Sequence, residues 1–182
     1  ISNDIYRSLE YTKKVLDENT LIKAAKKISE ARRIAIFGLG NSSAIAMDAQ
    51  HKFLRAGLSA AAYCDNHMQA IVASHLTKND VAIGISHSGS SIDVVEALRL
   101  SKEAGATTIS ITNFGKSPII KQSDIVLYTA SEETKYTIFG MYSRIAQLAI
   151  IDTIYTYIVL HKSEEALKAI RATEMALQNK KY

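Results

Sequence analysis

Residues 82–93, AIGISHSGSSID, join three patterns that together indicate the fold. An apolar run ends at Ile85 and predicts a buried strand. A turn with four serines and one glycine follows, and an amphipathic pattern that predicts a helix begins at Ile92. Apolar strands that alternate with helices are typical of a parallel sheet covered on both faces.

The same order of strand and helix recurs along the chain. Right-handed crossovers then predict an α/β fold, a three-layer αβα sandwich with a five-stranded parallel sheet in the flavodoxin-like order 2-1-3-4-5. The expected strands are 33–37, 60–64, 80–85, 107–112 and 124–129. The expected helices are 3–16, 20–30, 43–55, 68–75, 92–104, 137–161 and 163–178, with a helical turn at Pro118.

The chain divides into a helical extension or linker over residues 1–30 and one domain over residues 31–182. Asn19 and Thr20 offer cap chemistry between the first two helices. Gly57 and Gly105 are expected just past helix ends. Because the chain begins at Ile1 in a helical pattern, we expect it to be part of a longer protein.

The composition excludes several classes of function. The chain is 47% apolar and 22% charged, and its net charge of +4 is scattered, so nucleic-acid binding is not indicated. The single cysteine, Cys64, excludes an internal disulfide and favours the cytoplasm; we expect it to be buried. No secretion signal is present, and the most apolar segment, residues 147–160, contains Asp152 and is too short to span a membrane.

Two turns are rich in glycine and hydroxyl groups: Gly38–Ser43 after the first strand and Ser86–Ser91 after the third. In the order 2-1-3-4-5 these strands are neighbours, so both turns line the crevice at their carboxyl ends. Glycine allows close backbone approach, serine hydroxyls donate to oxygen, and helix N-termini favour anions. The sequence therefore predicts a phosphate-binding site that needs neither metal nor cofactor.

Other interpretations account for parts of this pattern. Ser90-Ser91-Ile92-Asp93 matches an S-x-x-D capping box, which leaves Ser86 and Ser88 unexplained. Gly38-x-Gly40-x-x-Ser43 partly matches a dinucleotide-binding loop, with Asp65 near the end of the second strand as the ribose-binding acid. A Walker-type loop is absent from the sequence.

The motif Ser86-x-Ser88-Gly89-x-Ser91-x-Asp93 resembles the S-x-S-G-x-T-x-[DE] signature of the SIS (sugar isomerase) domain, and Gly38-x-Gly40-x-Ser42 resembles its first loop. The resemblance extends from about Arg33 to Leu160. Residues 131–134, 143–148 and 151–152 are similar to the variant in RpiR-type bacterial transcription regulators. Those proteins join an N-terminal helix-turn-helix domain to a SIS domain that senses a phosphosugar, so the resemblance implies that this chain is the effector half, with DNA bound only through the missing domain.

The resemblance also implies the site residues. Threonine is usual in the family at the position of Ser91, but the hydroxyl group is retained. The implied phosphate contacts are Ser86, Ser88, Gly89, Ser90 and Ser91, and the implied sugar contacts are Gly40, Asn41, Ser42 and Ser43. Three residues are added from their positions in the chain: His87 lies within the second turn, at a position that varies in the family, and Glu132 and Glu133 follow the fifth strand and reach the same crevice.

An isomerase or etherase would use the same crevice, and it requires an acid and a base. The candidates are Glu132, Glu133, His87 and His51, but no pair of them is fixed by spacing. Because residues 131–134, 143–148 and 151–152 are similar to the RpiR-type variant, we expect a binding module and keep the enzyme as the alternative.

The segment 138–160 is apolar on nearly all sides, which is typical of a helix that is wholly buried or shared with a partner. We expect a homodimer or tetramer through this helix, with burial in the chain's own core as the alternative.

Overall fold

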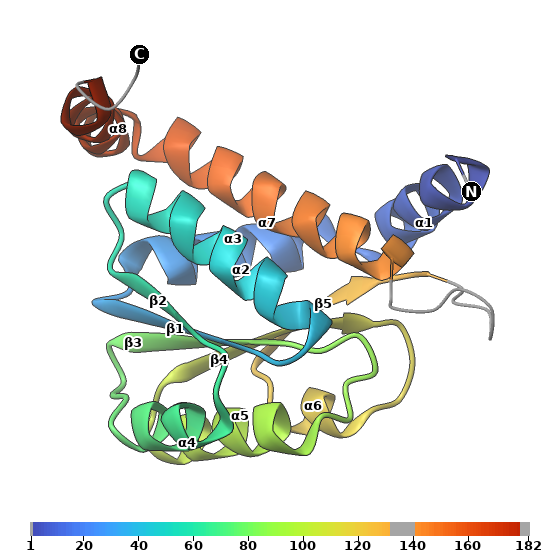
Figure 1. Ribbon diagram of the computed structural model, residues 1–182. Coiled ribbons are helices and arrows are strands. Elements are labelled where there is room, and N and C mark those ends of the chain that lie inside the picture. The colour runs from blue at the N-terminus through green and yellow to red at the C-terminus, as the bar shows by residue number, and fades with distance from the viewer. Residues whose placement is uncertain (1, 132–140, 179–182) are drawn as a thin grey trace.

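The computed structural model describes residues 2–131 and 141–178. A five-stranded parallel sheet in the order β2-β1-β3-β4-β5 lies between two layers of helices (Figure 1). The sandwich and its strand order are therefore confirmed. The strands are β1 (Arg33–Gly38), β2 (Ala60–Tyr63), β3 (Asp80–Ile85), β4 (Thr107–Asn113) and β5 (Ile125–Thr129). The helices are α1 (Ser2–Val15), α2 (Glu18–Glu30), α3 (Asn41–Arg55), α4 (Asn66–Ser74), α5 (Ile92–Glu103), α6 (Pro118–Lys121), α7 (Met141–His161) and α8 (Ser163–Gln178).

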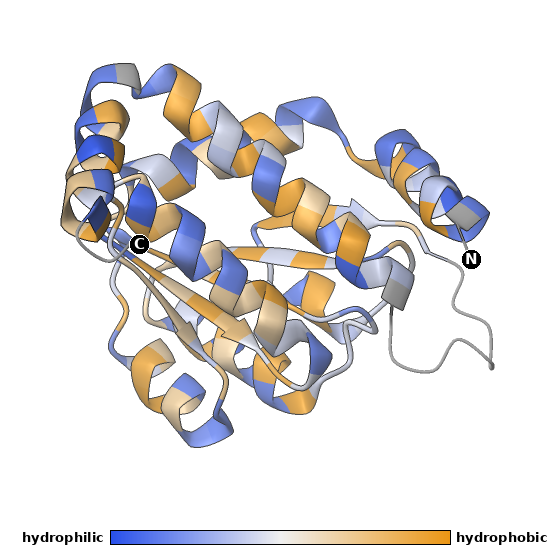
Figure 2. Cartoon of the chain, turned by 45° about the horizontal axis from the view of Figure 1, so that its top comes forward, coloured by the Kyte–Doolittle hydropathy of each residue, from blue (hydrophilic) through white to orange (hydrophobic). Residues whose placement is uncertain are grey.

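Each face of the sheet has its own apolar core, because neighbouring residues of a strand point to opposite faces. Ile34 and Ile36 of β1 pack with α2, α3 and α7 on one side. Ala35 and Phe37 pack with α4, α5 and α6 on the other. In Figure 2 the strands are mainly hydrophobic, whereas the helices alternate between hydrophobic and hydrophilic residues. Burial on both faces explains why the strands read as continuous apolar runs.

Helix α7 has 21 residues, so it is longer than the apolar segment noted in the sequence, and by length and composition it could cross a membrane. Within the fold, however, it packs against α1, α2 and α3. Its Ile150, Ile154 and Ile158 are almost fully buried in the core, and Asp152 forms an ion pair with Lys52 of α3. Burial in the chain's own core thus accounts for much of its apolar character.

The helix caps agree only in part with those predicted from the sequence. Gly57 and Gly105 follow α3 and α5 with φ of 79° and 93°, as predicted. The cap of α2 is Asp17 rather than Asn19 or Thr20, because its carboxylate accepts a hydrogen bond of 2.7 Å from the Thr20 amide. A carboxylate at this position also offsets the positive end of the helix dipole.

Helix α1 is attached to the end of β5 near the carboxyl edge of the sheet (Figure 1). The buried Thr12 hydroxyl accepts a hydrogen bond of 3.0 Å from the Ala130 amide, which follows β5. Ser8, also buried, donates to the carbonyl of Tyr142 in α7 at 3.4 Å. These two contacts hold α1 against both β5 and α7.

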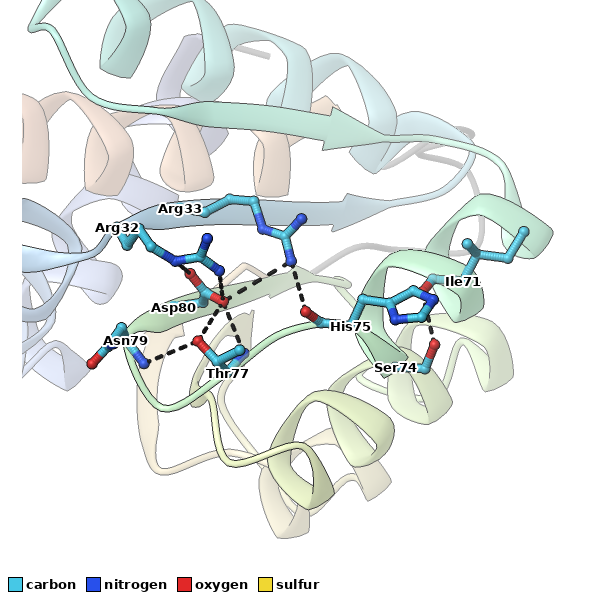
Figure 3. A network of polar contacts seen from close by, with 8 residues as sticks. All are labelled: Arg32, Arg33, Ile71, Ser74, His75, Thr77, Asn79 and Asp80. Atoms are coloured by element: carbon cyan, nitrogen blue, oxygen red, sulfur yellow. Dashed lines mark hydrogen bonds and ion pairs between the residues drawn. The ribbon is translucent and has the colours of Figure 1, made fainter.

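The amino edge of the sheet is held by the buried carboxylate of Asp80 (Figure 3). It accepts from Arg32 Nε and Nη2 at 3.1 and 2.9 Å, and from the Thr77 amide and hydroxyl at 2.8 and 2.9 Å. Burial alone would raise the pKa of Asp80, but these hydrogen bonds outweigh burial and hold the pKa below its usual range. Asp80 therefore stays ionised and ties β3 to the loop before it and to the residue before β1.

Candidate functional site

The two serine-containing turns begin side by side at the carboxyl edge of the sheet. β1 and β3 are parallel neighbours, and the last residue of β1, Gly38, is in register with the last residue of β3, Ile85. The helices that follow, α3 and α5, leave toward opposite faces of the sheet (Figure 1). The predicted juxtaposition of the two turns is therefore present, at the switch point where open α/β sheets bind ligands.

The first turn brings backbone close to the crevice. Gly40 has a φ of 55° and is the N-cap of α3 without a side-chain cap bond. The Ser43 hydroxyl donates to the Gly40 carbonyl at 2.6 Å. At Gly38 a Cβ atom would lie 2.6 Å from the carbonyl oxygen of Ser42, so only glycine fits there. Ser42 and Ser43 are half-buried, and Asn41 is exposed at the start of the helix.

Ser86 organises the second turn from within. It is 2% exposed, and its hydroxyl oxygen lies 3.1 Å from that of Ser91 and accepts a hydrogen bond of 3.2 Å from the Gly89 amide. The Gly89 amide also lies 3.2 Å from the Ser86 carbonyl oxygen. Ser86 therefore shapes the loop, while the half-buried Ser91 and the exposed Ser88 and Ser90 lie nearer to solvent.

The start of α5 has no side-chain cap. Its N-cap is Ser91, whose side chain makes no cap hydrogen bond, so the capping box on Ser90 and Asp93 is wrong. The Ser91 hydroxyl is instead within hydrogen-bond distance of Ser86. The first helical bond runs from the Val95 amide to the Ser91 carbonyl at 3.0 Å. The amides of residues 92–94 precede that bond, as at any helix N-terminus, and helix N-termini in general favour anions.

Gly89 fits into a space that no other residue could occupy. Its φ is 64°, and a Cβ atom there would lie 2.6 Å from Ser117 Cβ and 2.8 Å from Thr112 Oγ1. The Gly89 carbonyl in turn accepts from the Ile119 amide at 3.0 Å. The second turn, Ser86–Ser91, which we call the serine loop, thus packs against the segment after β4, and this contact fixes its shape.

Two residues at the end of β4 lie beside the site and were not predicted from the sequence. The Asn113 amide donates to the His87 carbonyl at 3.1 Å, and its side-chain oxygen accepts from the Ser131 amide at 3.1 Å. Phe114 is 62% exposed and makes an edge contact with Tyr128 at 5.3 Å between ring centroids. Asn113 is the last residue of the buried strand β4 and Phe114 follows it, at the same edge as the serine loop, and this position could have revealed them.

The remaining predicted site residues are His87, His51, Glu132 and Glu133. His87 is half-buried inside the serine loop, and its carbonyl accepts from Asn113. His51 is exposed on α3, remote from the first turn of that helix. Glu132 and Glu133 lie outside the described residues. Within the part of the chain that the structure describes, no three acidic, histidine or cysteine side chains are grouped to hold a metal.

The predicted roles of Asp65 as a ribose-binding acid and of Cys64 as a buried residue both differ from the structure. Asp65 caps α4, accepting a hydrogen bond of 2.9 Å from the Met68 amide, so its carboxylate is already engaged and does not support a ribose contact.

Cys64 is exposed rather than buried, because it follows the edge strand β2 and leaves the sheet there. Partial burial of the sulfur still raises the pKa of the Cys64 thiol.

The profile of the SIS domain matches residues 27–157. An uncharacterized HTH-type transcriptional regulator of Caldanaerobacter subterraneus is 39% identical over 181 residues, which cover 100% of this chain and 64% of that protein. The HTH-type transcriptional regulator RpiR of Escherichia coli is 33% identical over 166 residues, 91% of this chain and 56% of that protein. The chain therefore spans less than two thirds of these relatives.

A solved structure shows the same fold. The Vibrio vulnificus NanR protein, in a complex with ManNAc-6P, superposes with a TM-score of 0.92 at 24% identity, covering 100% of this chain and 69% of that one. The sheet, the two layers of helices and the N-terminal helices therefore have the same architecture as in that structure.

Proposed function

This chain belongs to the SIS domain family, and from that premise we propose that it is the phosphosugar-sensing domain of an RpiR-type transcription regulator. The observation that carries the proposal is the pairing of the two turns at the ends of β1 and β3. A phosphosugar is the ligand that such a pair of turns fits best. DNA would be contacted by a helix-turn-helix domain outside these 182 residues, and a cytoplasmic location accords with that role.

In this proposal the phosphate group lies over the serine loop and the start of α5. Ser88, Ser90 and Ser91 supply hydroxyl donors, and the first amides of α5 add N–H donors aligned with the helix dipole. Ser86 and Gly89 hold the loop in shape. The sugar reaches the first turn, where Gly40, Asn41, Ser42 and Ser43 are available. Glu132 and Glu133 remain predicted contacts.

A thermal-shift panel tests the proposal. Phosphosugars should stabilise the protein by about 2.7 kcal/mol at a hundredfold excess over Kd, and free sugars, NAD and inorganic phosphate should stabilise it far less. Changing Ser88 and Ser91 together to alanine should remove the shift. Ser29→Ala with Ser74→Ala is the matched control, because those hydroxyls only contact carbonyls of their own helices. A shift with NAD but not with phosphosugars would refute the proposal.

The alternative, an isomerase or etherase, is tested on the same samples. Glucose 6-phosphate, fructose 6-phosphate, glucosamine 6-phosphate and muramic-type 6-phosphates are incubated with the protein and followed by NMR. We expect the substrates to be recovered unchanged. Turnover that the Ser88→Ala/Ser91→Ala protein lacks would replace the sensor with an enzyme.

The proposal includes association of two copies. Less than half of α7 is buried in the chain's own core, so association through α7 stays a prediction, and the exposed apolar side chains of α3 are a second candidate surface. Met47 and Leu54 are 59% and 49% exposed and lie on one face with His51 between them. We call these three residues the α3 stripe.

A further inference from the structure

A pocket lies beside the edge strand β5, next to the core that α4, α5 and α6 form with the sheet. Its volume is about 810 Å³, within the range of small-molecule sites. It is lined by Tyr128 of β5, Val95 of α5 and most of the segment 114–122, which contains α6. None of the described residues that line it belongs to the two turns after β1 and β3, so the pocket is separate from the predicted phosphosugar crevice.

The lining of this pocket contains two aromatic residues. Phe114 and Tyr128 are in edge contact, with 5.3 Å between ring centroids and 70° between ring planes. Phe114 is 62% exposed. The half-buried side chains of Val95 and Ile120 pack against the core of this face and add aliphatic surface to the lining. Contiguous carbon surface that remains open to solvent is typical of a ligand-binding groove.

The charged residues of the lining are both positive. Lys116 and Lys121 are exposed, and neither forms an ion pair within the part of the chain that the structure describes. The nearest carboxylate along the chain, that of Asp124, pairs with Lys102 at 3.0 Å and accepts from the Thr108 amide and hydroxyl. No acidic residue is among the described residues of the lining. The two ammonium groups therefore favour an anionic group on a ligand.

We propose that this pocket binds a small aromatic anion, a flat ring system that carries one carboxylate. The ring system lies against Phe114, Val95 and Ile120, and the carboxylate faces Lys116 and Lys121. A free sugar fits this lining poorly, because its hydroxyls would lose water against carbon surface. The inference does not rest on the proposed function, since it uses none of the residues of the two turns.

Fluorescence anisotropy of 2-naphthoate tests the inference, and the chain contains no tryptophan that would add background. The carboxylate should bind about fivefold more tightly than its uncharged amide, 2-naphthamide, because exposed ion pairs add only modest affinity. Lys116→Gln with Lys121→Gln should remove that difference and leave the affinity for the amide unchanged. Lys23→Gln with Lys26→Gln, two exposed lysines of α2 outside the lining, is the control matched in charge.

A second variant tests the aromatic wall. Phe114→Ala should weaken both ligands by about tenfold, because it removes the exposed ring. Tyr6→Ala is the control, since Tyr6 is 71% exposed on α1, outside the lining, and this protein should bind both ligands like the parent. Methyl NMR gives an independent measure: the methyl resonances of Val95 and Ile120 should shift when 2-naphthoate is added.

Three results would overturn the pocket and leave the proposed function standing. They are equal affinity for the carboxylate and the amide, unchanged affinity in Phe114→Ala, and binding that leaves the methyl resonances of Val95 and Ile120 unmoved. The Ser88→Ala/Ser91→Ala protein should bind 2-naphthoate like the parent. Loss of binding in that protein would place the ligand in the crevice and would also overturn the pocket.

Discussion

At the scale of single residues, the serine loop depends on a glycine that the sequence alone presents as one loop residue among several. The structure shows that Gly89 has a positive φ and lies against Ser117 and Thr112. The hydroxyls that would bind phosphate are held in place by that contact. The loop is therefore formed in advance, which reduces the entropy lost on binding.

Gly89→Ala should lower the free energy of unfolding by about 3 kcal/mol, from backbone strain together with overlap. It should also abolish phosphosugar binding. Gly105→Ala is the control: φ there is 93°, but the nearest atom to the added Cβ is 3.8 Å away. That variant should lose only about 1 kcal/mol and bind normally. Urea unfolding measures both variants, and equal losses would contradict the overlap.

Asp80 makes a second residue-scale prediction. Because its folded pKa is depressed, its contribution to stability is present above the ordinary aspartate pKa of about 3.9 and is lost as pH falls below it. Asp80→Asn should cost about 2–3 kcal/mol at pH 7, and the difference from the parent should shrink below about pH 4.

Urea titrations across pH 3–7 measure this effect. Asp152→Asn, whose half-exposed side chain pairs with Lys52 on the surface, should cost at most about 1 kcal/mol. A constant difference between parent and Asp80→Asn over the whole pH range would show that ionisation of Asp80 does not contribute.

At the scale of elements, α1 is attached through one buried hydrogen bond to the strand end beside the site. Thr12 accepts from the Ala130 amide, and Ser131 follows directly. A displacement of the end of β5 would therefore alter this hydrogen bond, and with it the attachment of α1. Such a helix can report occupancy only if the ligand binds the attached and detached states with different affinity.

Thr12→Val keeps the shape of the side chain but leaves the Ala130 amide without its acceptor. We expect a loss of about 1–3 kcal/mol in the stability of the α1 attachment. Hydrogen exchange should show faster opening of residues 2–15, with the sheet unchanged. Thr12→Ser retains the hydroxyl and should behave much more like the parent. Uniformly faster exchange across the whole sheet would argue against a local role.

At the scale of the whole molecule, the exposed apolar α3 stripe is the surface where we expect a second copy. Met47→Glu with Leu54→Glu should convert a dimer to a monomer at micromolar concentration, measured by sedimentation velocity. The far-ultraviolet circular dichroism should be unchanged, because both side chains are exposed. Lys23→Gln with Lys26→Gln on α2 changes the net charge by the same amount and is the control. A parent protein that sediments as a monomer would refute the dimer.

The sequence by itself determined the α/β order, the strand order and the two turns of the crevice. Apolar runs, helical periodicity and glycine positions are local signals, and right-handed crossovers leave few ways to connect them. The positions of β1, β3 and α5 therefore agreed closely with the sequence.

Only the tertiary structure decided which polar groups were engaged elsewhere. Asp65 caps a helix, Ser91 contacts Ser86 rather than a backbone amide, and α7 buries its isoleucines within its own core. It also brought Tyr11 and Val15 beside Ser131, more than a hundred residues away in the sequence. The physical reason is that hydrogen-bond partners and burial depend on which distant surfaces meet, and residue spacing along one chain does not encode that.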